Sequence, residues 1–371
     1  MTPQLHQSTL IVGIALALQG CARGSSSTFG EPNPSLDTAD AATDSGSLPD
    51  FLPGPVSGWE KPFDGITCRH PDVQAHCSNG WCRVPAGCFI KGSPPDELGR
   101  GLKTEEQRAV TLTHDVWIQQ TEVTQEQWLA QGLPNPSGIG PDGTDGDCTD
   151  DPRCPVGNVT WFETLAFANM QSKAHLPPLP SCYELHGCTG SVGEGMRCES
   201  VSITAPSIYE CEGFRLLTDA EYEYALRAGT TTAFYTGSMT MEALADASQC
   251  NGHEPLLPIA WYCANAGRFT HPVGQKRPNS WHLYDMAGNS EEWVHDEEKG
   301  KTGAPGPWAD PGGTMSTYKY RQTRGGSVIS WPRVLRSASR ALGGTWGFHS
   351  PTIGFRLARS VLTTEAAAKG W

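Results

Sequence analysis

Two hydroxyls near the C-terminus, Ser327 and Ser330, have side chains that could act as nucleophiles. A serine becomes nucleophilic when a neighbouring general base, most often His, takes its proton. The sequence places no His to activate either hydroxyl, and the chain lacks a Gly-x-Ser-x-Gly elbow. We therefore predict no catalytic residue from these patterns.

Carboxylates crowd a second segment, where five Asp occur within residues 142–151. An EF-hand needs ligands at positions one, three and five of its loop, and this segment fails that order. We interpret it as a solvated acidic loop closed by a Cys148–Cys154 disulfide. A calcium site is the alternative, because a cation offsets the repulsion between crowded carboxylates.

Cysteine usage indicates an exported, crosslinked protein. The chain has 13 Cys and no C-x-x-C pair, which argues against a zinc ribbon or a redox motif. If Cys21 carries lipid, an even twelve remain for disulfides. We expect a local pair Cys250–Cys263 beside Cys148–Cys154, and a quartet that pairs within itself: Cys182, Cys188, Cys198 and Cys211. The full connectivity stays open.

The N-terminus predicts export and a lipid anchor. Residues 10–18 form an unbroken apolar run of nine, which is too short to span a bilayer but suits a signal peptide over residues 1–20. The following Leu18-Gln19-Gly20-Cys21 resembles a bacterial lipobox, so Cys21 would be lipidated; an ordinary cleaved secretory peptide is the alternative. Residues 21–60 are rich in Gly, Ser, Thr, Pro and Asp and read as a disordered tether.

Composition excludes several classes of protein. The net charge is −13, which disfavours a phosphate backbone as a partner, so we expect no nucleic acid. The 42 Gly, 29 Pro and 12 Trp indicate a turn-rich chain rather than a helical bundle.

Three capping boxes predict short helices. They begin at Thr124, Thr160 and Thr218, each followed three residues later by Gln or Glu. Gly229 should stop the third helix. Short β-like runs occur at residues 109–118 and 353–358, so the expected class is α+β with much irregular loop.

The order of the motifs resembles the formylglycine-generating enzyme (sulfatase-modifying factor) family over about residues 82–360. The segments that carry the resemblance are 84–93, 105–107, 121–125, 155–161, 213–225, 271–274, Leu283-Tyr-Asp-Met-Ala-Gly-Asn-Ser-Glu-Glu-Trp293, Arg324-Gly-Gly-Ser327 and Ile353-Gly-Phe-Arg-Leu357. The resemblance implies that family's variant of the C-type-lectin-like fold, low in regular structure. We expect a Cys-rich extension at 61–83, the domain at 84–360 and a tail at 361–371.

The resemblance also shows which residues of this chain stand where the family's active members bind their catalytic copper. Its active members hold copper with two Cys shortly after Arg-Gly-Gly-Ser, where this chain has Ser330 and Leu335. Soft Cu(I) needs thiolates, so we expect no copper and no formylglycine-generating activity. A sister branch uses iron held by histidines, and we find no such site among the 11 His.

Calcium is the metal that the resemblance favours. Transferred residue by residue, Asp285 and Glu292 would supply carboxylates, and Gly288 and Ser290 main-chain carbonyls, to a structural ion. The alternative is a turn in which Asp285 caps Gly288 and Glu292 faces solvent.

We expect a binding or interaction module, with a ligand groove near Ser327, Ser330, Trp331 and Leu335. Its ligand would be a peptide, protein or glycan of the bacterial envelope, on a lipid-anchored protein of the outer membrane that faces the periplasm or the surface. The aromatic residues Trp331, Trp346 and Phe348 could wall that groove, but core packing is the favoured interpretation. An enzyme of altered chemistry and a purely structural envelope protein remain alternatives.

Overall fold

The computed structural model describes residues 53–101, 104–138, 146–148, 151–245, 250–297, 306–312, 320–345 and 347–361. All of them belong to the unit that begins at Ser47. Cys21, residues 21–52 of the predicted tether, Trp346 and most of the acidic loop lie outside these ranges. The last residues of the predicted tether are ordered instead: Val56 forms a β-bridge with Val73, and strand β1 begins at Trp59. Within them, no helix is long and apolar enough to cross a bilayer.

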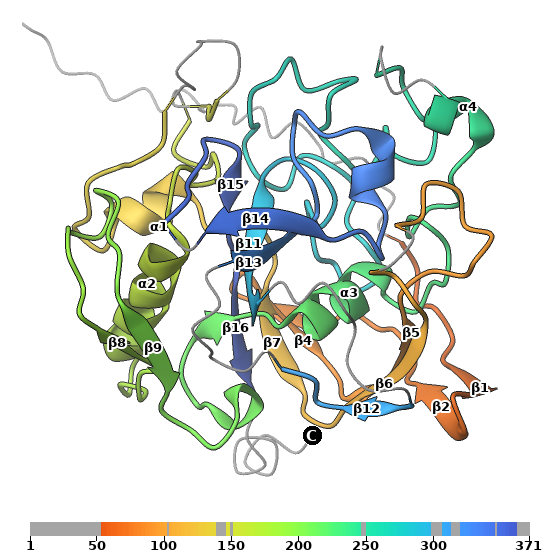
Figure 1. The fold of residues 1–371 in the computed structure, drawn as a ribbon, viewed down its shortest axis with the longest axis horizontal. Helices are drawn as coiled ribbons and strands as arrows, with labels where there is room; N and C mark the ends of the chain where they lie inside the picture. Colours follow the sequence, from red (N-terminus) through yellow and green to blue (C-terminus); the bar gives the residue numbers. More distant parts are fainter. Residues whose placement is uncertain are drawn as a thin grey trace, which may run out of the picture. The chain divides into compact units, whose positions relative to one another are not determined.

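Short strands carry most of the regular structure (Figure 1). The central sheet has the antiparallel order β10-β16-β7-β4-β3, with strands β10 (Arg215–Leu216), β16 (Leu357–Ser360), β7 (Val116–Gln119), β4 (Trp81–Val84) and β3 (Cys77–Ser78). Strand β4 crosses the boundary predicted between residues 83 and 84, so the segment 61–83 ends inside the central sheet.

Two further sheets and two hairpins complete the strands. The four-stranded sheet has the order β14 (Ala341–Thr345), β13 (Tyr320–Arg324), β11 (Glu291–Glu297), β15 (Ile353–Gly354). The three-stranded sheet has the order β12 (Trp308–Ala309), β6 (Arg108–Leu112), β5 (Gly87–Lys91). The hairpins pair β1 (Trp59–Phe63) with β2 (Ile66–His70), and β8 (Tyr183–His186) with β9 (Ser200–Ile203).

The helices are α1 (Gln125–Leu129), α2 (Trp161–Ala174), α3 (Asp219–Arg227) and α4 (Met241–Ala245), with 3-10 turns at Ile208–Glu210 and Pro332–Leu335. All three predicted capping boxes are confirmed, each with both reciprocal hydrogen bonds. Helix α3 ends at Arg227, and the predicted stop, Gly229, follows the cap at φ 86°; the cap residue Ala228 itself takes the left-handed conformation at φ 44°. The α+β class is confirmed.

Alternation in the central sheet decides which residues enter the core. Cys82, Ile118 and Ala358 lie in one row across β4, β7 and β16, and each is fully buried. Because successive side chains of a strand point to opposite faces, the neighbouring residues Trp81, Trp117 and Arg359 project from the other face.

Disulfides hold the irregular segments to these elements. The pairs are Cys68–Cys88, Cys77–Cys82, Cys148–Cys154, Cys182–Cys211, Cys188–Cys198 and Cys250–Cys263. They include both local pairs that spacing predicted, and the quartet pairs within itself. A disulfide stabilises the folded state mainly by restricting the unfolded chain, which suits a fold rich in loops that bury little apolar surface.

Candidate functional site

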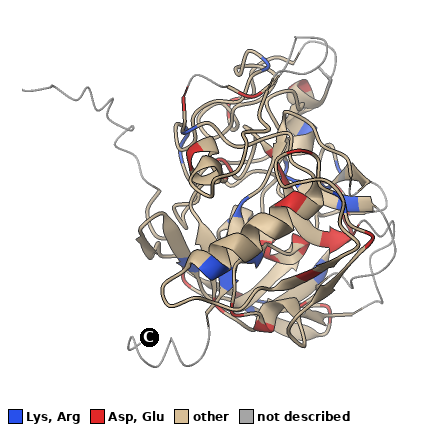
Figure 2. Cartoon of the chain, turned by 90° about the vertical axis from the view of Figure 1, so that its left-hand side faces the viewer, with Lys and Arg blue, Asp and Glu red and all other residues tan. Residues whose placement is uncertain are grey.

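The charges of the sequence motifs pair with one another inside the fold. Basic and acidic residues lie on neighbouring elements (Figure 2). The guanidinium of Arg356, from the Gly-Phe-Arg motif, donates to both oxygens of Glu292 on β11 at 2.7–3.0 Å. The Tyr222 hydroxyl of α3 donates to the same carboxylate at 3.1 Å. Both members of the ion pair are 1% exposed or less.

A second buried network surrounds helix α3. Arg324, of the Arg-Gly-Gly-Ser motif, contacts Glu223 at 2.9 Å and Asp219 at 3.0 Å, and Lys91 contacts Asp219 at 2.6 Å. Burial opposes ionisation of Glu223, but the positive charge of Arg227 and its neighbours lowers the pKa of that carboxyl to about 2. These motif residues therefore join α3 to β5 and β13, so the structure gives them a role in holding the fold together.

The predicted groove residues lie together around a tight turn. The main-chain N–H of Ser327 donates to Ser330 Oγ at 2.9 Å, and the two hydroxyl oxygens are 3.5 Å apart. A Cβ on Gly326, which has φ 71°, would lie 3.3 Å from Ser330 and 3.4 Å from Leu335. No His or acidic side chain hydrogen-bonds either hydroxyl within the described residues, so the turn has no activated nucleophile.

The two positions expected to hold copper have different environments. Leu335 is 1% exposed and belongs to the hydrophobic core, whereas Ser330 is half-buried in the turn. Neither side chain is a soft donor, and every Cys from residue 68 onward is in a disulfide. These residues do not fit a copper ion.

Core packing is the wrong interpretation for two of the flanking aromatic residues, Trp331 and Phe348, and the third, Trp346, lies outside the described residues. Trp331 is 41% exposed and Phe348 is 45% exposed. The Arg333 guanidinium lies 5.6 Å from the centroid of the Trp331 ring, within cation–π range. Trp331 therefore stands at the surface beside the turn of Ser327 and Ser330.

Asp285 and Glu292, two of the four residues predicted to bind calcium, lie in a cluster that the sequence did not reveal completely, and Ser290 N–H donates to a third member, Glu122. The fourth predicted residue, Gly288, donates its main-chain N–H to Gly325 at 3.1 Å. The carboxylates of the cluster are Glu122, Asp285 and Glu292, all buried. Burial raises the pKa of Asp285 to about 6, and burial together with the charge of Asp285 raises the pKa of Glu122 well above its ordinary value. Glu122 lies in the 121–125 motif but no local pattern marked it, because its neighbours come from other motifs.

The arrangement does not fit calcium at these four residues. Both oxygens of Glu292 are taken by Arg356, whose positive charge disfavours a nearby cation. Asp285 Oδ2 accepts from Gly274 N–H at 2.7 Å. Asp285 Oδ1 and Glu122 Oε2 are buried without a partner in the described part of the chain. Within the same residues, no three His, Cys, Asp or Glu side chains are grouped to hold a metal.

Calcium removal therefore gives a direct test of the cluster. We expect EGTA to leave the melting temperature of the full chain unchanged at pH 7, because Arg356 already neutralises Glu292. Differential scanning calorimetry with excess calcium or EGTA measures this. A higher melting temperature in calcium would show that the folded chain binds the ion, and would contradict this expectation.

The chain is similar in sequence to one known protein family and to individual known proteins. Residues 70–361 match the model of the sulfatase-modifying factor enzyme 1-like domain. Chaperone protein LppX of Paenibacillus barcinonensis is 32% identical over 202 residues, 50% of this chain and 62% of that protein. Formylglycine-generating enzyme of Streptomyces coelicolor is 28% identical over 233 residues, 62% of this chain and 60% of the enzyme. The chain thus spans about three fifths of the length of these curated relatives.

Two solved structures share the fold. Treponema denticola variable protein 1 superposes with a TM-score of 0.58 at 24% identity, over 82% of this chain and 99% of that one. PvdO from Pseudomonas aeruginosa superposes with a TM-score of 0.57 at 24% identity, over 76% and 94%. With the motif order and the family match, these findings show that the chain belongs to the sulfatase-modifying factor enzyme 1-like family.

Proposed function

We propose that this protein is a lipid-anchored component of the bacterial envelope whose family domain binds polypeptide instead of oxidising a cysteine with copper. One observation carries the proposal: an exposed Trp331 stands directly beside Ser330, at a position where the family's active members need a sulfur ligand. The envelope location rests on the apolar run at 10–18 and on Cys21, and outer-membrane retention is part of the proposal.

The chemistry of the exposed segment favours a peptide over a glycan. Ile329 is 37% exposed and Trp331 is 41% exposed, and Arg333 adds a cation beside the indole. Large apolar side chains next to Arg are typical of protein-contact surfaces, where Trp and Arg contribute most to affinity. A curated relative, LppX, is named as a chaperone, and chaperones contact polypeptides.

Truncation of the exposed indole tests the proposal. We expect Trp331→Ala to weaken binding of reduced, carboxymethylated lactalbumin, a permanently unfolded chain, by about tenfold, because a central Trp is often a binding hot spot. Isothermal titration calorimetry with the full chain measures the affinity. The control Leu129→Ala removes another exposed apolar side chain, 47% accessible on α1, and should change nothing.

Two results would contradict the proposal. The first is a wild-type protein that does not bind the unfolded chain. The second is a Trp331→Ala protein that binds it as well as the wild type does, which would show that this segment has no role in binding. Equal melting temperatures of the variants establish that any loss is not unfolding. Formylglycine produced in a sulfatase-derived cysteine peptide with copper, detected by mass spectrometry, would instead show that catalysis persists.

A further inference from the structure

A pocket separate from the turn at 326–331 opens on the outward face of the central sheet. Its floor is built by the row Arg359 and Trp117, which are direct partners across β16 and β7, with Trp81 on the next strand, β4. These side chains project from the face opposite the buried row Cys82–Ile118–Ala358. The cavity has a volume of about 270 Å³.

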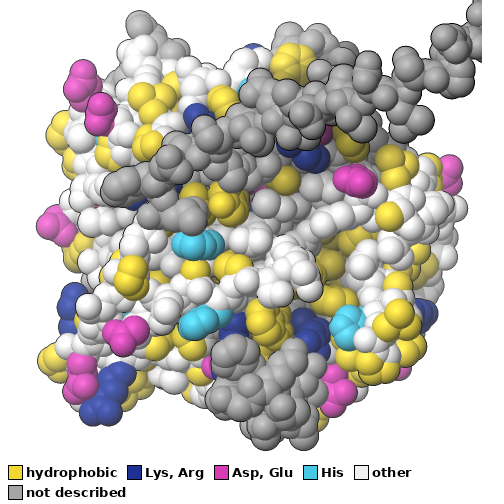
Figure 3. Space-filling model, turned by 180° about the vertical axis from the view of Figure 1, so that it is seen from behind, with side chains coloured by type: hydrophobic (Ala, Val, Ile, Leu, Met, Phe, Trp, Pro, Cys, Tyr) yellow, Lys and Arg dark blue, Asp and Glu magenta, His cyan; other side chains and the backbone are white. Residues whose placement is uncertain are grey.

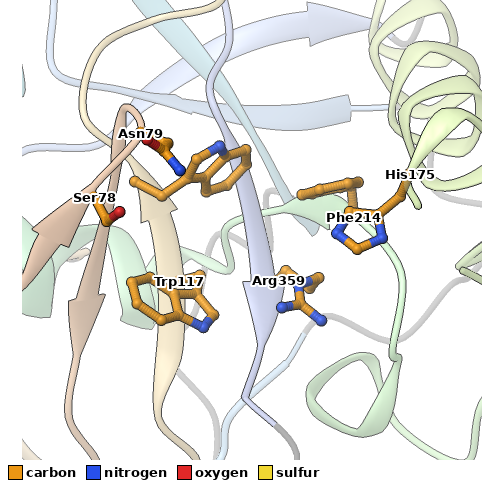
Figure 4. A pocket seen from close by; sticks show the side chains of 7 residues that line it. Ser78, Asn79, Trp117, His175, Phe214 and Arg359 are labelled. Carbon is orange, nitrogen blue, oxygen red and sulfur yellow. The ribbon is translucent and has the colours of Figure 1, made fainter. Parts of the chain in front are cut away.

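Side chains from other segments close the pocket on two sides. The turn between β3 and β4 supplies Ser78 and Asn79 on one side; His175, at the end of α2, and Phe214, just before β10, stand on the other (Figure 4). Arg359 lies between Trp117 and Phe214 in that view. The centroids of the Phe214 and Trp81 rings are 5.1 Å apart, so this side contacts the floor.

Crosslinks and buried hydrogen bonds hold both sides in place without a ligand. The Cys77–Cys82 disulfide closes the short hairpin that carries Ser78, Asn79 and Trp81. Cys182–Cys211 anchors the chain just before Phe214, whose main-chain N–H donates to Ser172 Oγ at 2.8 Å. A pocket formed in advance loses less conformational entropy when it binds.

The lining restricts the charge of the ligand. Aromatic walls of this kind often surround a cationic guest. Here the Arg359 guanidinium lines the same space, and no Asp or Glu lines it among the described residues. A guanidinium is the side chain best shaped to hold a carboxylate. The pocket therefore suits an anion with a flat apolar face and disfavours a cation.

The polar side of the pocket, formed by Ser78 and Asn79, suits a ligand that carries hydroxyl groups. The side chains of Ser78 and Asn79 are exposed and make no hydrogen bond within the described residues. A hydroxyl and an amide provide donors and acceptors in both directions, which matches ligand hydroxyls. The volume, near the lower limit for small-molecule sites, suits about one six-membered ring. Seen from behind, the surface carries hydrophobic side chains interspersed with a few His, and its acidic side chains lie mainly near the outline (Figure 3).

We propose that this pocket binds a hexuronate, a sugar ring that combines an apolar C–H face, hydroxyl groups and a carboxylate. Trp117 and Trp81 would contact the ring face, Arg359 the carboxylate, and Ser78 with Asn79 the hydroxyls. The site is separate from the polypeptide-binding segment, so it adds a ligand to the proposed function and does not depend on it.

Titration of the full chain with sodium D-glucuronate, D-glucose and benzoate tests the proposal by tryptophan fluorescence and calorimetry. We expect saturable binding of glucuronate that is at least about tenfold tighter than that of glucose, which lacks the carboxylate, and of benzoate, which lacks the hydroxyls. No saturation by glucuronate, or benzoate binding as tight as glucuronate, would overturn the assignment.

Variants assign the contacts. Arg359→Gln should abolish the preference for glucuronate over glucose, and the exposed pair Ser78→Ala with Asn79→Ala should abolish the preference for glucuronate over benzoate while the fold is kept. Trp331→Ala, at the other site, should leave glucuronate binding unchanged. If the hairpin variants keep full selectivity, or if Trp331→Ala weakens glucuronate binding, this pocket is not the site.

Discussion

Replacing Arg356 by Met is expected to lower the free energy of unfolding by about 3–5 kcal/mol, because removing one member of a buried ion pair leaves the other charge uncompensated. Arg356 is fully buried, and Glu292, which accepts from it with both oxygens, is 1% exposed. The guanidinium also donates to the carbonyl oxygens of Gln119, Gln120 and Tyr284. Urea denaturation of the full chain under oxidising conditions measures the loss.

A double substitution separates the charge from the packing. Adding Glu292→Gln to Arg356→Met removes the orphaned charge, and the Gln side chain can still accept from Tyr222. The double variant should therefore recover much of the lost stability. It should not recover all of it, because the hydrogen bonds from Arg356 to main-chain carbonyls are still missing. The control Arg69→Met breaks an exposed pair with Glu60, whose members are 76% and 54% exposed, and should change stability by less than about 1 kcal/mol. A loss below about 1 kcal/mol for Arg356→Met would contradict a structural role for the pair.

Asp296→Asn is expected to change how stability depends on pH. Burial, together with the negative charge of Asp219, raises the pKa of Asp296 to about 7, while the main-chain N–H of Asp219 donates to Asp296 Oδ2 at 2.6 Å. A carboxyl whose folded pKa is raised contributes stability that is complete below its unfolded pKa of about 4 and is lost as pH rises through about 7. Asn keeps the acceptor for the Asp219 N–H but does not titrate.

Comparing the wild type with Asp296→Asn therefore isolates the titration of Asp296 from that of the other groups. The wild type should lose about 2–4 kcal/mol relative to Asp296→Asn between pH 4 and pH 7, and the difference should be constant above pH 8. His residues whose pKa values are lowered by burial, such as the buried His70 and the half-buried His271, act in the opposite direction but are common to both proteins. Parallel stability curves for the two proteins from pH 4 to 8 would show that folding does not raise the pKa of Asp296.

Local features were predictable because they depend on residues close in sequence. The capping boxes at Thr124, Thr160 and Thr218 need only a backbone turn and a side chain three residues away, so the sequence determined them. The same holds for the short disulfide loops Cys148–Cys154 and Cys250–Cys263. The order of the motifs, a linear property, was enough to identify the family.

Only the tertiary structure decided the partners of these motifs and the second pocket. Arg356 and Glu292 are 64 residues apart, and the pocket draws Trp81, Trp117, Phe214 and Arg359 from four separate strands or loops. Such contacts depend on strand order and on which face each strand buries, and local propensity carries neither. The sequence by itself therefore established the family, the helix starts and the absence of copper ligands. The tertiary structure established that Glu292 pairs with Arg356, that Trp331 is exposed before a 3-10 turn, and that an aromatic pocket lies on the face of the central sheet opposite the buried row.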